Sequence, residues 1–101
     1  MLTRVGDSDR YHEFLRVPAL SAGIYVLPVG SRDPQTPHQE DEIYFVVRGR
    51  AKVRLGKEER DVREGDVIFV EKRFDHRFIH VEEELVLLVV FAPAESGKFS
   101  K

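Results

Sequence analysis

Two separate stretches of this chain carry histidine and glutamate in a pattern that could hold a metal ion. His38 and Glu42 lie close together in the sequence, and His76 follows in the second half. Divalent first-row metals accept imidazole nitrogen and carboxylate oxygen together, and two histidines with one carboxylate leave coordination positions open for water or substrate. We therefore predict that these residues bind one divalent ion, which would be Fe, Mn, Ni or Zn, provided that the fold brings them together.

Each of these residues also has a simpler interpretation. A single histidine is more often a surface residue or a hydrogen-bonded core residue than a metal ligand. Glu42 ends the acidic run Glu40-Asp41-Glu42, where a solvated charge is the ordinary interpretation. The choice depends on whether the chain points the three side chains to a common place.

The stretch that contains His76 is typical of a β-strand with a partly polar inner face. Side chains alternate between the two faces of a strand, so His76, Phe78 and His80 would share one face, and Arg77 and Ile79 the other. Inward-facing polar side chains of a small barrel need a hydrogen-bond partner, a water or a metal ion. We predict that His80 is either a fourth ligand or a group that transfers protons.

Glu42 lies on another predicted strand, where Tyr44 and Val46 share its face. The segment before this strand, residues 30–37, holds two prolines and a glycine and is predicted to be an irregular loop. His38 would then lie at the mouth of the barrel, near Glu42. The Tyr44 hydroxyl is a second candidate for proton transfer.

The elements that must position these side chains are short β-rich runs separated by Gly, Pro and Asp, with no helical period. Gly56-Lys57 fits a tight hairpin, and Gly65 fits a turn that needs a left-handed backbone. Short strands at this spacing favour a closed barrel or a sandwich, because an open sheet would expose hydrophobic edges. The predicted strands span residues 22–27, 43–48, 51–55, 59–62, 67–70, 75–81 and 85–92.

Four of these residues, Gly30, His38, Glu42 and Gly49, resemble the first sequence motif of the cupin superfamily. In that motif His38 takes the place of the second histidine, Glu42 that of the glutamate and Gly49 that of the closing glycine. The place of the first histidine is occupied by Thr36. The chain therefore lacks one of the ligands that the resemblance implies.

The second cupin motif resembles the stretch from Gly65 to His76, and both of these residues match it. Glu71 and Arg73 replace its usual proline and glycine. His80 falls at the asparagine position of the motif and keeps a polar side chain there.

With Thr36 in place of a histidine, the implied ligand set is incomplete, because a hydroxyl is a poor metal donor beside imidazole and carboxylate. A substitute ligand such as His80, Gln35 or Glu40 could complete the set. A water molecule could also take the position, or the chain could hold no metal.

The resemblance covers residues 22–92 and implies an all-β fold, a small cupin-type β-barrel of the double-stranded β-helix or jelly-roll kind. The 101 residues fit a single domain, residues 1–101.

A net charge of -2 gives no field that favours nucleic acid or an anionic membrane surface. The absence of cysteine excludes disulfides and thiolate ligands. No stretch reads as a targeting or membrane-spanning segment, so we expect a cytoplasmic protein.

Cupins include dioxygenases, isomerases and lyases as well as sensor domains, so the resemblance implies no single reaction. We predict a metal-dependent enzyme of one of these three types that acts on a small organic molecule. The alternative is a non-catalytic module that binds or senses a small metabolite at the barrel mouth.

Residues 85–91 are apolar on both faces of a strand, whereas a lone barrel needs only one apolar face. The outer face therefore needs a cover. Because cupins are often dimers, we predict that a second copy of the chain supplies this cover in a homodimer.

Overall fold

The structure, a computed structural model, describes residues 10–33 and 38–96. These residues form strands and no helix, which confirms the all-β prediction. None of them belongs to a helix long and apolar enough to cross a membrane. The strands are β1 (Tyr11–Val17), β2 (Leu20–Leu27), β3 (Asp41–Leu55), β4 (Glu58–Arg63), β5 (Val67–Val70) and β6 (His76–Ala92).

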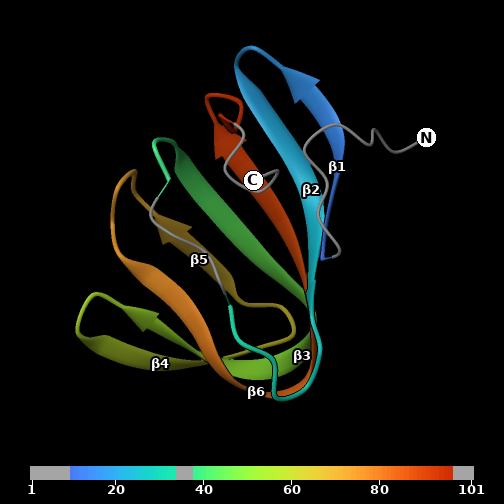
Figure 1. The fold of residues 1–101 in the computed structure, drawn as a ribbon, viewed down its shortest axis with the longest axis vertical. Coiled ribbons are helices and arrows are strands. Elements are labelled where there is room, and N and C mark those ends of the chain that lie inside the picture. The colour runs from blue at the N-terminus through green and yellow to red at the C-terminus, as the bar shows by residue number, and fades with distance from the viewer. Residues whose placement is uncertain (1–9, 34–37, 97–101) are drawn as a thin grey trace.

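The described strands form one antiparallel sheet that curls over itself (Figure 1). Its order is β1-β2-β6-β3-β4, and β5 pairs with β3. The first half of β3 pairs with β5 and with the second half of β6, whereas the second half of β3 pairs with β4 and with the first half of β6. Both long strands therefore run through two walls of the fold, and the inner side chains of these walls meet in one interior.

Strands β3 and β6 are longer than predicted, and β1 was not predicted at all. The stretches 43–48 and 51–55 belong to one strand, and so do 75–81 and 85–92. Gly49, between the first two stretches, has a φ of 102°, and register shifts on both sides of it bend β3 without ending it. A glycine between two strand patterns therefore marks a bend within a strand here.

The two predicted turns are confirmed. Leu55 pairs with Glu58 across the tight hairpin, in which Gly56 has a φ of 63°. Gly65, between β4 and β5, has a φ of 94°. Both glycines thus adopt the left-handed backbone that residues with a Cβ rarely adopt.

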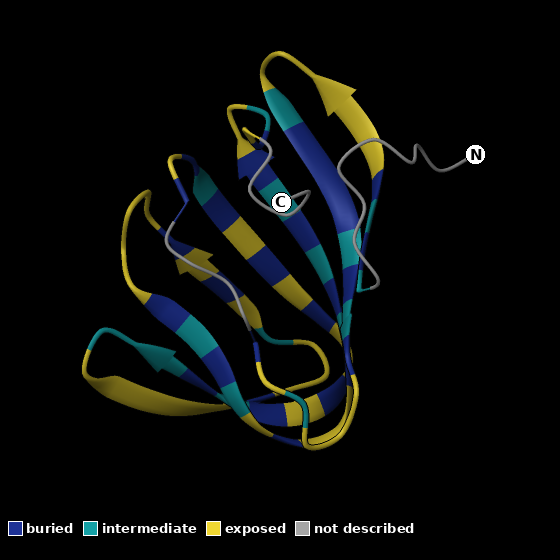
Figure 2. Cartoon of the chain, in the orientation of Figure 1, coloured by how far each residue is buried: buried dark blue, intermediate teal, exposed yellow. Residues whose placement is uncertain are grey.

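Buried and exposed residues alternate along the strands, as the bands on β3 and β6 in Figure 2 show. The buried face forms a hydrophobic core that fills the interior, and its largest side chains include Tyr25, Tyr44, Phe78 and Phe91. Four buried polar side chains come from the segment that leads into β3 and from the starts of β3 and β6: His38, Glu40, Glu42 and His76.

Candidate metal centre

The structure brings the three predicted ligands into the interior from two walls. His38 lies just before β3, Glu42 lies in the first half of β3, and His76 is the first residue of β6. All three are no more than 2% exposed. His76 Nε2 lies 3.1 Å from Glu42 Oε1, and the ring centres of His38 and His76 are 6.3 Å apart. These side chains share one interior, as their spacing predicts.

A short loop positions His76 and connects it to His38. Arg73 N donates a hydrogen bond to the His38 carbonyl oxygen at 2.7 Å, and Arg73 Nε donates to Gln39 Oε1 at 3.1 Å. Arg73 has a φ of 64°, a conformation that glycine adopts without steric strain and other residues do not. The loop thus keeps a glycine-like backbone at a position where the cupin motif has glycine and this chain has arginine.

The hydrogen bonds of His76 fix the orientation of its ring. Nδ1 lies 2.9 Å from the Phe74 carbonyl oxygen, which can only accept, so Nδ1 carries a proton. Nε2 faces Glu42 Oε1 and, at 3.0 Å, the Tyr44 hydroxyl. When His76 is protonated, Nε2 donates to Glu42, and when it is neutral, Nε2 accepts from Tyr44. Metal-binding histidines commonly have their second nitrogen held by a carbonyl in this way.

The two histidines have opposite pKa shifts. Burial is the largest influence on both and favours the neutral imidazole. For His38, burial prevails over the nearby Glu42 carboxylate and lowers the pKa. For His76, burial is outweighed by the hydrogen bond and the charge of Glu42, so the pKa is raised. In the metal-free protein, one imidazole is therefore protonated more easily than usual and the other less easily.

Two carboxylates lie close together where β3 begins. Glu40 and Glu42 are both buried, whereas Asp41 between them is half-buried. Glu40 Oε1 and Glu42 Oε2 have no hydrogen-bond partner among the described residues. A buried carboxylate oxygen without a partner is unfavourable, and a bound ion is one arrangement that would satisfy it.

His80 does not join this group, and the prediction that it shares a face with His76 is wrong. His80 is exposed and has a φ of 49°. This left-handed residue shifts the alternation along β6 by one position, so that Val81 becomes the next buried residue after Phe78. The His80 side chain therefore lies outside the interior and is neither the fourth ligand nor the proton-transfer group there.

The other proposed substitutes for the missing histidine differ in where they lie. Gln35 lies outside the described residues, as does Thr36, which occupies the place of the missing histidine. Glu40 is the substitute that the structure places in the interior, where it is 4% exposed. Tyr44, the second candidate for proton transfer, is also buried there.

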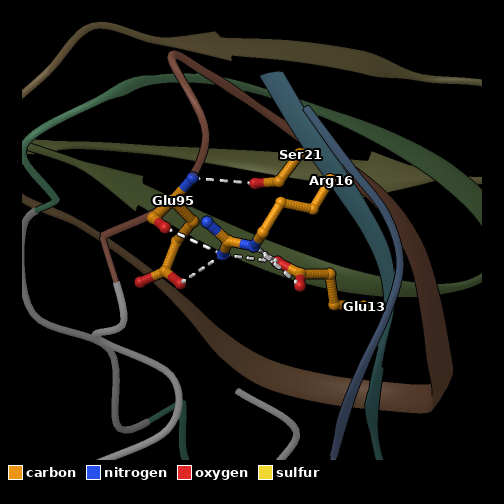
Figure 3. Close-up of polar contacts among 4 residues, drawn as sticks. All are labelled: Glu13, Arg16, Ser21 and Glu95. Carbon is orange, nitrogen blue, oxygen red and sulfur yellow. Dashed lines mark hydrogen bonds and ion pairs between the residues drawn. The ribbon is translucent and has the colours of Figure 1, made fainter. Parts of the chain in front are cut away.

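A second group of buried acids lies between β1 and the segment after β6 (Figure 3). Arg16 donates hydrogen bonds to both Glu13 carboxylate oxygens and, at 2.9 Å, to the Glu95 carbonyl oxygen. Glu95 N donates to Ser21 Oγ at 2.8 Å. The negative charge of Glu95 also favours the protonated form of His38, so this group influences the candidate site. No sequence pattern indicated it, because Glu13 lies on the unpredicted strand and Glu95 follows the last strand.

The donor types in the interior fit a divalent ion, although the side chains are not at ligand distances. Among residues 10–33 and 38–96, no three His, Asp or Glu side chains are grouped closely enough to hold one ion. Imidazole nitrogen binds zinc at about 2.1 Å, which places the centres of two rings on one tetrahedral ion roughly 5 Å apart. His38 and His76, whose centres are 6.3 Å apart, have to approach each other before both can bind.

Comparison with known families shows to which family the chain belongs. The family model described as Cupin domain matches residues 23–91, which is more than half of the chain. This chain is a cupin. The match includes both motifs, so the resemblance read from their residues is confirmed.

An uncharacterized protein of Streptomyces coelicolor, SCO3923, is 44% identical to this cupin over 93 residues, which cover 92% of the cupin and 89% of that protein. The DMSP lyase DddQ of Ruegeria pomeroyi has a TM-score of 0.73 and 24% identity, over 83% of this cupin and 47% of DddQ. This cupin thus spans about half of that enzyme. A Klebsiella pneumoniae protein with a double-stranded β-helix domain has a TM-score of 0.75 and 15% identity, over 86% and 80% of the two chains. These likenesses show the fold, which is the predicted double-stranded β-helix.

Proposed function

We propose that this cupin is a metal-dependent enzyme that acts on a small organic molecule, by a reaction of the dioxygenase, isomerase or lyase type. Glu42 supports the proposal most directly. Its Oε1 contacts His76, while its buried Oε2 has no hydrogen-bond partner among the described residues. A cation beside this oxygen would satisfy it. DddQ, a lyase of the same fold, is an example of catalysis on this scaffold.

His38, Glu42 and His76 would hold the ion, with Glu40 as the fourth ligand in place of the missing histidine. Glu40 supports this role because it is buried, its negative charge favours the protonated form of His38, and its Oε1 has no hydrogen-bond partner within the described parts of the chain. Nitrogen and oxygen donors of these kinds suit Fe, Mn, Ni or Zn. The bound ion would supply a Lewis acid for a carbonyl or enolate oxygen, or open positions for dioxygen.

Tyr44 is the proposed proton-transfer residue. Its hydroxyl can both donate and accept a hydrogen bond, and it lies 3.0 Å from His76 Nε2, beside the proposed ligands. The Phe78 ring packs edge-on against Tyr44, and Phe91 packs edge-on against His38, each with ring centres 4.9 Å apart. Tyr44 would therefore hold a substrate oxygen and exchange a proton with it where aromatic side chains exclude water.

The metal content of protein purified without chelators tests this proposal. We expect stoichiometric metal in the wild type and none in Glu42→Gln or His76→Ala, because the first change removes the negative charge of a ligand and the second removes a ligand. Glu40→Gln should keep the metal but bind it at least about tenfold more weakly, since loss of a charged ligand should cost no less than loss of a residue that only supports a ligand. His80→Ala is the matched control, because it removes an exposed imidazole outside the interior.

Circular dichroism shows whether each variant retains the β-fold, so that loss of metal is not confused with unfolding. The proposal fails if the wild type, grown with iron, manganese, nickel and zinc supplied, contains no metal. It also fails if folded Glu42→Gln retains the metal with unchanged affinity.

One observation favours a second function, a module that binds a small metabolite without catalysis. His76 Nε2 already contacts Glu42 Oε1 at 3.1 Å and the Tyr44 hydroxyl at 3.0 Å, so these buried groups form a network without an ion. Metal-free wild type whose melting temperature rises in the presence of small metabolites would support this function instead.

A further inference from the structure

A pocket of about 520 Å³ lies against the first half of β6, outside the candidate metal centre. Arg77 and Ile79 line it, and both are half-buried. They alternate along β6 with His76 and Phe78, which point into the interior. The pocket is therefore formed on the outer face of the strand whose inner face carries a proposed metal ligand.

The opposite wall of the pocket is the segment that follows β2, and hydrogen bonds fix it in place. Gly30 N donates to the Val81 carbonyl oxygen at 3.1 Å. Asp33 is buried, with Oδ1 accepting from the Tyr25 hydroxyl at 2.7 Å and Oδ2 accepting from Phe78 N at 2.9 Å. These hydrogen bonds fix the segment after β2 to β6, so the pocket is already formed before a ligand binds.

Three arginines line this pocket: Arg32 from the segment after β2, Arg54 from β3 and Arg77 from β6. Arg54 and Arg77 are direct Cα partners on adjacent strands. Like charges directly opposite each other in a sheet repel and are destabilising. Glu59, the partner of Arg54 on β4, does not line the pocket. Asp33 is the one carboxylate in the lining, so three guanidinium groups face a single negative charge there.

His80 adds a fourth nitrogen-bearing side chain to the lining. Its φ of 49° is uncommon for a residue other than glycine, and such strained positions cluster at functional sites. Because of this backbone angle, His80 lies on the outer face of β6 at the pocket and not on the inner face. The side chain can then donate a hydrogen bond beside the arginines.

The lining indicates the chemistry of a ligand. Guanidinium groups bind phosphate and carboxylate with paired, charge-assisted hydrogen bonds. Ile79 and Val81 add apolar surface, and the volume falls in the range of small-molecule sites. We propose that this pocket is a second ligand site, separate from the metal centre, that binds a small organic anion through its phosphate or carboxylate group.

Calorimetric titration of the wild type with glycerol 3-phosphate, glycerate and uncharged glycerol tests the proposal. These probes have similar skeletons and differ in the anionic group, so the tighter ligand identifies the preferred group. We expect millimolar or tighter binding of at least one anion and none of glycerol. Arg54→Gln and Arg77→Gln should each weaken binding about tenfold or more, which corresponds to about 1.4 kcal/mol.

Arg60→Gln is the matched control, because it removes the same charge from an exposed residue of β4 that pairs with Glu58. Amide chemical shifts of the wild type give a measurement that depends on no variant, and the largest changes should fall at Ser31, Ile79 and His80. The proposal is overturned if neither anion binds, if Arg60→Gln weakens binding as much as Arg54→Gln, or if the shift changes lie elsewhere.

Discussion

Two opposing influences act on the charge of His76. Burial disfavours the imidazolium, while the Glu42 carboxylate at 3.1 Å favours it, and the net result is a raised pKa. A raised folded-state pKa means that protonation stabilises the fold. This contribution is fully present below the ordinary pKa of 6.5 and is lost as the pH rises through the raised value. His38 acts oppositely, because its lowered pKa makes the fold less stable as the pH falls below 6.5.

Glu42→Gln should therefore change the titration of His76 in metal-free protein. The amide keeps the shape of the side chain but removes the charge, which is the main influence that opposes burial, so the pKa of His76 should fall. The measurement is an NMR titration of the imidazole Cε1 protons in the presence of a chelator. The pKa of His38 should also fall, because Glu42 is the largest influence that raises it. An unchanged His76 titration would contradict the role given to Glu42.

At the scale of elements, the bend of β3 depends on one close contact. A Cβ placed on Gly49 would lie 2.1 Å from the Glu84 carbonyl oxygen of β6, which is far inside van der Waals contact. Gly49 also has a φ of 102°. Because the bend carries β3 from one wall to the other, it aligns Glu42 and Tyr44 with His76. The glycine is required by both the backbone angle and the neighbouring strand.

Gly49→Ala should destabilise the protein much more than Gly65→Ala. Gly65 has a similar φ of 94° but nothing within 4 Å of a Cβ, so its substitution measures the backbone strain alone. We expect about 1 kcal/mol for Gly65→Ala and about 3 kcal/mol or more for Gly49→Ala, where strands must also separate. Urea unfolding at equilibrium measures both. Equal losses of the free energy of unfolding would show that the contact with Glu84 is relieved at little cost.

The alternation of side chains predicted the interior correctly wherever the backbone stays extended. Glu42, Tyr44, His76 and Phe78 are all buried, as a period of two requires. The same rule failed at His80, because a single left-handed residue shifts every later side chain by one position. No feature of the sequence marks that residue, since positive φ is expected at glycine. Glu95 and Asp33 lie outside the strands, so their burial depends on contacts distant in sequence that no local pattern contains.

At the scale of the whole molecule, one surface remains apolar after the fold is complete. The outer strip consists of Ile43, Phe45 and Val47 on β3 with Val67 and Phe69 on β5, all of them exposed. Register makes it continuous, because Ile43 pairs with Phe69 and Phe45 pairs with Val67. The strip also borders half-buried side chains of β6, the strand that is apolar on both faces. A contiguous apolar surface across adjacent strands is typical of a protein interface.

We propose that a second copy of the chain covers this strip in a homodimer. A strip on a sheet face can pack against its own copy around a twofold axis, which places like side chains in contact and closes the assembly.

Phe69→Lys should disrupt this dimer, because Phe69 is 62% exposed in the single chain and a lysine there would bring two charges into an apolar contact. Val29→Lys is the control, since Val29 is 63% exposed but lies outside the strip. Light scattering at micromolar concentration should give a dimer for the wild type and Val29→Lys and a monomer for Phe69→Lys. A monomeric wild type would overturn the homodimer proposal.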